Sequence, residues 1–278
     1  MPTIRASMLP AYNDCSRKVA SQQYREYIEA AGYRLNSGTP TGIGALLGIS
    51  VHRILEKYFV SRLNYDIFDF QKTVDETISQ FEADTSGGCL WDDTTSNKDT
   101  AIFQMTRMSH LYIETVGKNV KPLATELNIK VKVDEQYTFS GHIDLICEDL
   151  INGGIYLKDF KTGAINRSHY AQLGGYSLLC KSGTQYKDIT KASIDFIQRS
   201  KKTKPQNEIE IVEYQIELCE HEAWQTVLNV KNDLNRFIQT GQWYEFRGNP
   251  QTMLCSEKYC NAHGTDFCPI SKHKRSVA

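Results

Sequence analysis

The chain has 278 residues, of which 40% are hydrophobic and 23% charged, and its formal net charge is −1. This composition is ordinary for a globular protein that buries a sizeable core without disulfide staples. No apolar run approaches the roughly 20 residues that span a bilayer, and Met1–Pro10 lacks the features of a signal peptide. We therefore expect a cytoplasmic protein with no membrane partner. The near-zero net charge neither supports nor excludes a nucleic-acid partner, because local charged patches attract such partners whatever the net charge is.

Helical patterns fill the first part of the chain. An N-terminal segment leads into a predicted helix over Arg17–Ala31, and Gly42–Leu63 has apolar residues at helical spacing. Two more helices are expected over residues 70–83 and 100–118. The segment between them, Asp84–Thr100, is rich in Gly, Ser, Thr and Asp, which predicts a mobile loop.

Beyond residue 120 the pattern changes to alternating β-formers interrupted by two helices. Helices first, followed by a sheet with a crossing helix, predict an α/β core with a helical lobe. The expected elements are strands within Ala124–Asp149 and over Gly154–Thr162, Ala192–Gln198 and Glu208–Leu218, helices over His169–Lys181 and Glu220–Thr240, and an irregular tail from Trp243.

Asp159 and Lys161 are two residues apart in a predicted strand. Side chains alternate between the faces of a strand, so these two share a face. A carboxylate can hold a divalent cation there, while an ammonium group orients water or offsets developing negative charge. The motif alone is weak, because a surface ion pair would have the same spacing.

Four other residues fit such a site. Asp144 lies between apolar residues of a predicted strand, where an unpaired carboxylate is costly; it needs a metal, a basic group or a backbone donor as partner. His52 lies beside the apolar stripe of its helix, as a core residue or as a metal ligand. Gln172 and Tyr176 share one helix face, either for packing or for contacts with phosphate or the lysine.

Three of the eight cysteines fall close to the C-terminus, in the pattern Cys255-x₄-Cys260-x₇-Cys268. Zinc sites favour tighter pairs, whereas iron–sulfur clusters accept wider spacing. His263 lies inside the pattern and could replace a ligand in a zinc site. The cysteines therefore predict a metal centre whose metal is open.

A basic segment follows the predicted strand at 192–198. Its four cations in six residues could hold a DNA backbone, although a solvated turn has the same composition. The cations are Arg199, Lys201, Lys202 and Lys204.

Taken together, the motifs resemble PD-(D/E)XK nucleases of the RecB type. The start of the chain, Ser7–Lys18, looks like that of the iron–sulfur branch, which includes AddB-like nucleases, CRISPR adaptation nucleases and phage exonucleases. The resemblance implies a restriction-endonuclease-like mixed β-sheet flanked by helices. The matching motifs are Gly-x-x-x-His at Gly48–His52, Gly-x-x-Asp at Gly141–Asp144, Asp-x-Lys-Thr-Gly at Asp159–Gly163 and Gln-x-x-x-Tyr at Gln172–Tyr176.

The resemblance implies a catalytic Mg²⁺ or Mn²⁺ and a set of ligands for it. These ligands would be His52, Asp144, Asp159 and the backbone carbonyl of Phe160. The metal would lower the pKa of an attacking water and neutralise charge on the phosphodiester.

The family's remaining catalytic roles fall on three residues. Lys161 would position or activate water, and Gln172 and Tyr176 would support the site and touch DNA. Glu135 sits where the family often has an acid on the preceding strand, and its role stays open.

In this branch of the family, one N-terminal cysteine joins three C-terminal ones to hold a [4Fe–4S] cluster that links the chain ends. Here the four would be Cys15, Cys255, Cys260 and Cys268. Their spacing is wider than the family's usual Cys-x₂-Cys, which leaves Zn²⁺ as the alternative.

We therefore expect one nuclease domain over residues 1–278. It would contain an N-terminal cluster segment (1–31), a helical lobe (42–120), a catalytic α/β core (124–240) and a C-terminal four-cysteine staple (241–278).

The expected function is a DNA exonuclease acting on single strands or duplex ends, in recombination, repair or phage DNA processing in a bacterial or phage-infected cell. The alternative is an inactive DNA-binding scaffold of a helicase–nuclease or CRISPR-type complex. The chain has no Gly-x-x-x-x-Gly-Lys-Ser/Thr motif, so any unwinding would need a helicase or recombination partner.

Overall fold

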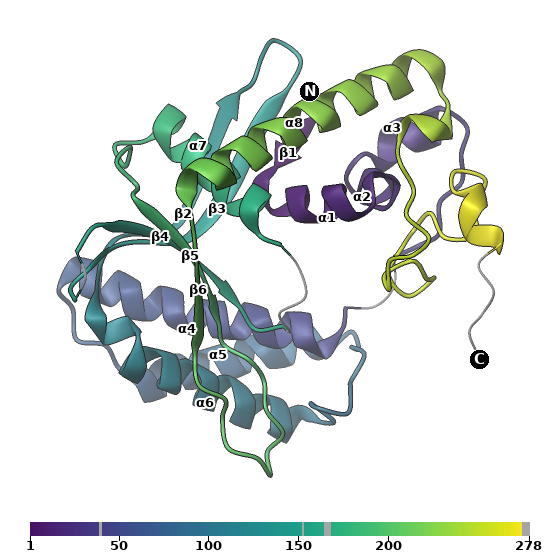
Figure 1. Ribbon diagram of the computed structural model, residues 1–278. Coiled ribbons are helices and arrows are strands. Elements are labelled where there is room, and N and C mark those ends of the chain that lie inside the picture. The colour runs from purple at the N-terminus through teal and green to yellow at the C-terminus, as the bar shows by residue number, and fades with distance from the viewer. Residues whose placement is uncertain (39–40, 152, 164–167, 274–278) are drawn as a thin grey trace.

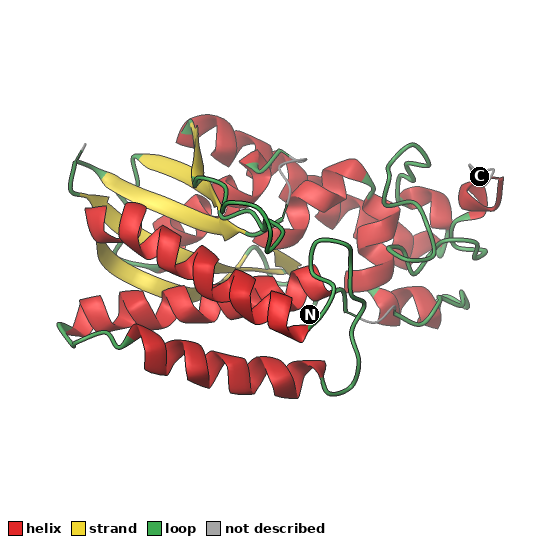
Figure 2. Cartoon of the chain, turned by 90° about the horizontal axis from the view of Figure 1, so that it is seen from below, coloured by secondary structure: helices red, strands yellow, loops and turns green. Residues whose placement is uncertain are grey.

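A computed structural model describes residues 1–38, 41–151, 153–163 and 168–273 of the chain (Figure 1). In these ranges six strands form one mixed sheet. Helices cover both faces of the sheet (Figures 1 and 2). This mixed α/β architecture fits the restriction-endonuclease-like fold expected from the sequence.

The long strand β3 (Thr138–Asp149) organises the sheet. Strand β2 (Val120–Lys132) pairs antiparallel along one edge of β3. The opposite edge is shared, because β1 (Thr3–Arg5) pairs parallel with residues 138–140 and β4 (Ile155–Lys161) pairs antiparallel with residues 145–148. Among the described strands, none pairs with residues 141–144 on that edge, and the catalytic candidates gather beside this opening.

The sheet continues from β4 through two further strands. Strand β5 (Lys191–Phe196) lies parallel to β4, and β6 (Glu210–Tyr214) lies antiparallel to β5. The strand predicted over Glu208–Leu218 is therefore too long, because helix α8 (Ile216–Thr240) begins within that range. The apolar positions of α8 follow the helical period from Ile216 onward, and they are buried.

Three helices pack on one face of the sheet (Figure 1). They are α4 (Ile43–Asn64), α5 (Phe70–Thr85) and α6 (Lys98–Thr115), which confirms the three helices predicted there. Their buried aromatic side chains include Phe59 and Tyr112, and both rings pack against Phe160 of β4. Phe160 thus ties the helical layer to the strand that carries the Asp-x-Lys motif.

The opposite face is covered by α7 (Tyr170–Gly183), α8 and the N-terminal helices, which share a second hydrophobic cluster. These helices are α1 (Leu9–Asp14), α2 (Ser16–Gln23) and α3 (Arg25–Ala30). The single helix predicted over 17–31 is wrong, because the chain bends at Tyr24. The Tyr24 backbone leaves helical geometry (φ −122°, ψ 30°), and its ring is 2% exposed.

The C-terminal segment returns to the N-terminal helices, beyond the end of α8 (Figure 1). It is mostly irregular, as predicted, with short 3₁₀ turns at Trp243–Glu245 and Pro269–His273. Two further 3₁₀ turns lie at Ala6–Met8 and Gly117–Asn119. None of the helices in the described ranges combines the length and apolarity that crossing a bilayer requires.

Candidate active site

A cleft of about 600 Å³ opens between helix α4, the middle of strand β2 and the C-terminal end of strand β4. Both charged and small side chains line it. Its walls are Gly44, Ala45, Gly48, Ile49, His52, Arg53, Glu56, Glu126, Phe160, Lys161, Thr162 and Gly163.

Strand β4 presents its two lysines on opposite faces. Lys158 points into the α6 side, where its ammonium group contacts both carboxylate oxygens of Asp195 at 3.2 Å in a fully buried pair. Lys161 shares the other face with Asp159, and its Nζ lies 2.5 Å from Asp159 Oδ2. The strand alternation used in the sequence argument is thus present in the structure.

Helix α7 fixes the second oxygen of Asp159. Gln172 Nε2 donates to Asp159 Oδ1 at 2.8 Å and to the Tyr176 hydroxyl at 2.9 Å. The Asp159 side chain is only 3% exposed, whereas that of Lys161 is 30% exposed. Gln172 and Tyr176 therefore hold the carboxylate rigidly, and the lysine next to it faces the cleft.

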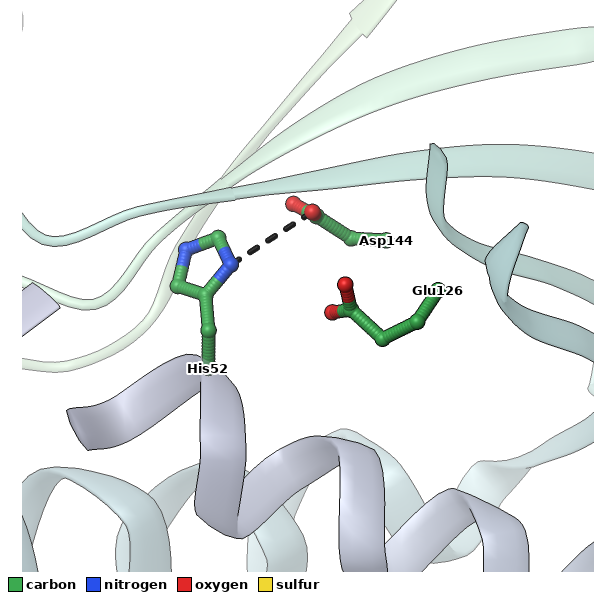
Figure 3. Close-up of side chains that lie close together, drawn as sticks. All are labelled: His52, Glu126 and Asp144. Atoms are coloured by element: carbon green, nitrogen blue, oxygen red, sulfur yellow. Dashed lines mark ion pairs between the residues drawn. The ribbon is translucent and has the colours of Figure 1, made fainter. Parts of the chain in front are cut away.

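Asp144 joins strands β3 and β4 where their backbone pairing has ended. Its Oδ2 accepts a 2.6 Å hydrogen bond from the backbone N–H of Phe160. Its Oδ1 lies 3.4 Å from His52 Nδ1, and His52 Nε2 lies 3.0 Å from the Phe160 carbonyl oxygen. Three of the four groups that the sequence places in a metal site are therefore brought together: His52, Asp144 and the Phe160 carbonyl. Figure 3 shows His52 and Asp144 pointing toward each other.

Two glycines allow the close approach of elements that builds this site. A Cβ at Gly48 would lie 2.8 Å from Thr162 Oγ1, so a side chain there would force either the Thr162 hydroxyl or α4 to move. A Cβ at Gly141 would lie 2.6 Å from Leu179 and 2.9 Å from Tyr176 of α7. These contacts explain the glycines in two of the sequence motifs.

Glu126 is a site residue that the sequence argument missed. It lies on β2 between the pairs Thr125–Leu145 and Leu127–Ile143, and thus opposite Asp144. Its backbone has φ 48°, a left-handed conformation that is uncommon in a strand. Donor atoms of His52, Glu126 and Asp144 all lie within 4.8 Å of one another (Figure 3).

Glu135, by contrast, is exposed in the turn between β2 and β3, outside the cleft. The signal for Glu126 was present in the sequence as a carboxylate within a predicted strand. Its left-handed backbone conformation could not be foreseen from that pattern.

Burial and mutual charge shift the titration of these groups. Burial lowers the pKa of His52, but the neighbouring Asp144 carboxylate outweighs it and raises that pKa to about 9. Burial and the Asp144 charge raise the pKa of Glu126 to about 8. Burial also raises the pKa of Asp159 to about 6, against the attraction of Lys161.

Lys161 remains a cation. Burial lowers its pKa, but the Asp159 and Asp144 carboxylates outweigh burial and raise the pKa above its ordinary value. The ammonium group is therefore suited to electrostatic stabilisation and to hydrogen-bond donation near neutral pH.

The donor set fits a divalent cation. Carboxylate oxygens are the ligands that Mg²⁺ and Mn²⁺ prefer in proteins, and an imidazole is a common ligand of transition-metal ions. Asp159 does not belong to the group of donor atoms that lie within 4.8 Å of one another. Its two oxygens are held by Gln172 and Lys161 instead.

The four cysteines singled out in the sequence line one small cavity between the N-terminal helices and the C-terminal segment. Among the described cysteines, no three sulfur atoms lie within 4.8 Å of one another. Arg17, which is 3% exposed, donates to Cys268 Sγ at 3.6 Å, and the backbone N–H of Asn249 donates to Cys15 Sγ at 3.4 Å. Burial raises the pKa of the Cys260 thiol to about 11, and the other three cysteines add to this rise.

The basic segment divides into two structural parts. Arg199 is half-buried and binds the loop before α6, since it donates to Asp92 Oδ2 at 2.9 Å and to Thr95 Oγ1 at 2.8 Å. Thr95 is fully buried, so the loop predicted to be mobile is anchored at this point. Lys201, Lys202 and Lys204 are exposed.

Comparison with known proteins shows which family the chain belongs to. A family model described as the PD-(D/E)XK nuclease superfamily matches residues 5–269, a span that includes the whole cleft and the four cysteines. No curated protein matches the chain. Among solved structures, the chain is similar to LHK-Exo in complex with dAMP at 14% identity and a TM-score of 0.31, covering 68% of this chain and 95% of that one. It is also similar to SSO0001 at 14% identity and a TM-score of 0.27, covering 76% of this chain and 86% of that one.

Proposed function

This chain belongs to the PD-(D/E)XK nuclease superfamily, and from that premise we propose that it is a Mg²⁺- or Mn²⁺-dependent deoxyribonuclease. We further propose an exonuclease of the RecB type, directed at single strands or duplex ends in recombination, repair or phage DNA processing. The motif order in the sequence supports this finer assignment. Family membership itself carries the metal-dependent nuclease chemistry.

One observation carries the proposal. The convergent donors of His52, Glu126 and Asp144 stand beside the Asp159–Lys161 ion pair, at the wall of an open cleft. A metal-binding group next to a fixed ammonium group is the arrangement that hydrolysis of a phosphodiester needs. We assign the cation to His52, Glu126, Asp144 and the Phe160 carbonyl, with Asp159 as a further candidate ligand.

When bound, the cation lowers the pKa of an attacking water and offsets charge on the phosphate. The chain supplies orientation and charge around it. Lys161 holds an ammonium group at the cleft, where it can donate to water or to a phosphate oxygen. Gln172 and Tyr176 keep the Asp159 carboxylate in one orientation, so the position of Lys161 is fixed in turn.

We propose that Cys15, Cys255, Cys260 and Cys268 hold a [4Fe–4S] cluster. The four cysteines line one small cavity, and iron–sulfur clusters accept the wide spacing that these residues have in the sequence. The buried Arg17 beside Cys268 suits an anionic group in that cavity.

The test is a nuclease assay on protein purified without oxygen and stripped of divalent ions with EDTA. Linear and circular DNA, single- and double-stranded and labelled at either end, would be supplied with Mg²⁺ or Mn²⁺. We expect cleavage of linear DNA that Asp144→Asn and Asp159→Asn abolish. A wild-type protein that binds these DNAs and cuts none of them would favour the inactive scaffold instead.

A further inference from the structure

The connection between β5 and β6 carries a compact cationic turn on the α6 side of the sheet (Figure 1). Lys204 N–H donates to the Lys201 carbonyl at 2.9 Å and closes the turn Lys201–Lys204, which we call the lysine turn. Its three lysines are exposed. Among the described residues, none of the three forms an ion pair with an acidic group, although many other lysines of this chain do.

Helix α6 holds the lysine turn in place through polar contacts at both of its ends. Gln104 is fully buried, and its Nε2 donates to the Ser200 carbonyl at 2.8 Å. Arg107 donates to Ser200 Oγ at 2.7 Å and to the Lys204 carbonyl at 2.8 Å. Three neighbouring lysines repel one another, yet these bonds keep them in one geometry.

An aromatic ring gathers further positive charge beside the turn. Arg107 lies over the Phe103 ring, with its Cζ 4.7 Å from the centroid. Lys202 Nζ lies 5.5 Å from the same centroid. Cations near an aromatic face are attracted to it, so Phe103 keeps two cations at one place on the surface.

Arg199 connects this surface to the catalytic cleft. Gly44 lines the cleft, and a Cβ there would lie 3.2 Å from Arg199 Nη2. The lysine turn begins two residues later. Since a chain extends at most about 3.6 Å per residue, the turn lies within roughly 20 Å of the cleft rim. A DNA strand advances 3.4 Å per nucleotide in a duplex, so at most about six nucleotides cover this distance.

We propose that the lysine turn, with Arg107 behind it, binds the sugar–phosphate backbone of DNA several nucleotides from the phosphodiester that is cut. The inference rests on the proposed function and names the part of the substrate that this surface holds. Arg199 is excluded from the contact, because its guanidinium group braces the loop at Asp92 and Thr95. Binding here is independent of base sequence and depends on salt.

The test measures binding without cleavage, by fluorescence anisotropy in EDTA, with labelled single-stranded oligonucleotides of about 4 and about 20 nucleotides. The variant Lys201→Gln/Lys202→Gln removes two charges from the turn. The matched control Lys72→Gln/Lys187→Gln removes two exposed lysine charges from positions outside the cleft. Thermal unfolding of both variants should match that of the wild type, because all four side chains are exposed.

We expect the wild type and the control to bind the long oligonucleotide more tightly than the short one. The turn variant should lose at least about tenfold in affinity for the long oligonucleotide only, and its slope of log Kd against log salt should fall by roughly 1.4. Unchanged affinity and slope on the long oligonucleotide, equal losses on both lengths, or a wild type that gains nothing from length would each overturn the inference. Cleavage is scored separately in Mn²⁺, so an inactive protein with the expected binding pattern contradicts the proposed function alone.

Discussion

Glu126 of β2 lies opposite Asp144 of β3, and donor atoms of both carboxylates and of His52 fall within 4.8 Å of one another. Two carboxylates at this distance repel each other unless a cation or a proton lies between them. Burial, and after it the charge of Asp144, raises the pKa of Glu126 to about 8. The pair therefore explains why this part of the cleft should take up a cation.

Glu126→Gln should weaken Mn²⁺ binding by at least about tenfold, because it removes one charged donor from the group. The measurement is a calorimetric titration of the EDTA-stripped protein. Glu135→Gln is the matched control, since Glu135 is exposed in the turn between β2 and β3. Equal affinities of the two variants would remove Glu126 from the metal site.

Metal binding near pH 7 should release protons. Metal ligands must be deprotonated, whereas His52 with a pKa of about 9 and Glu126 with a pKa of about 8 are largely protonated at pH 7. The affinity for Mn²⁺ should therefore rise with pH until both groups have lost their protons. Titrations in buffers of different ionisation enthalpy count the protons, and Glu126→Gln should release fewer. A pH-independent affinity between pH 6 and 9 would contradict the assignment of both ligands.

Lys161→Met should keep metal affinity and lose catalysis. Methionine has a similar length, but it cannot donate to water or to phosphate. We expect kcat to fall roughly 100- to 1,000-fold, the range for loss of one preorganised electrostatic group. Single-turnover cleavage in saturating Mn²⁺ measures this. Wild-type rates would show that the ion pair with Asp159 is structural only.

Gly48→Ala should weaken metal binding although residue 48 is not itself a metal ligand. The new Cβ would meet Thr162 Oγ1 at 2.8 Å, and we expect α4 to move away from the end of β4 to relieve this contact and to carry His52 with it. We expect a loss of about 1–3 kcal/mol in the free energy of unfolding and weaker Mn²⁺ binding. At Gly87 an added Cβ meets nothing within 4 Å, so Gly87→Ala should leave metal binding unchanged. The same metal affinity in both variants would argue against this packing role.

Cys268→Ser should abolish the visible absorption of anaerobically purified protein and lower its thermal unfolding temperature. It removes one sulfur from the cavity that joins the N-terminal helices to the C-terminal segment. Cys219→Ser is the control, because Cys219 is buried in helix α8 and does not line that cavity. Each kcal/mol lost should lower the unfolding temperature by roughly 2–4 °C. A colourless wild type containing stoichiometric zinc would replace the cluster with the alternative metal.

The sequence predicted most of the helices and core strands, because long stretches of one hydrophobic period dominate them. It could not predict β1, since three residues carry no period and the strand exists only through pairing with β3. The bend at Tyr24 was hidden for a similar reason. The tyrosine suits a helix locally, and it departs from one because its ring enters the core.

In the candidate site, too, local pattern predicted some residues, while others depended on contacts between distant parts of the chain. Asp159 and Lys161 could be paired from strand alternation, which is a local property. Glu126 required knowledge of its partner strand and of a left-handed backbone at φ 48°. The role of Arg199 also depended on distant residues, because Asp92 and Thr95 approach it only in the folded chain. Charge pattern alone therefore grouped Arg199 with lysines that behave differently.

The cleft takes His52 from the helical layer on one face of the sheet and, through Gln172, relies on α7 on the other face. Each layer has its own hydrophobic cluster, so each can open in a partial unfolding event that spares the other. Either opening would dismantle the site. Heat inactivation should therefore follow the weaker of the two layers, and enzyme activity could disappear at temperatures where much of the chain is still folded.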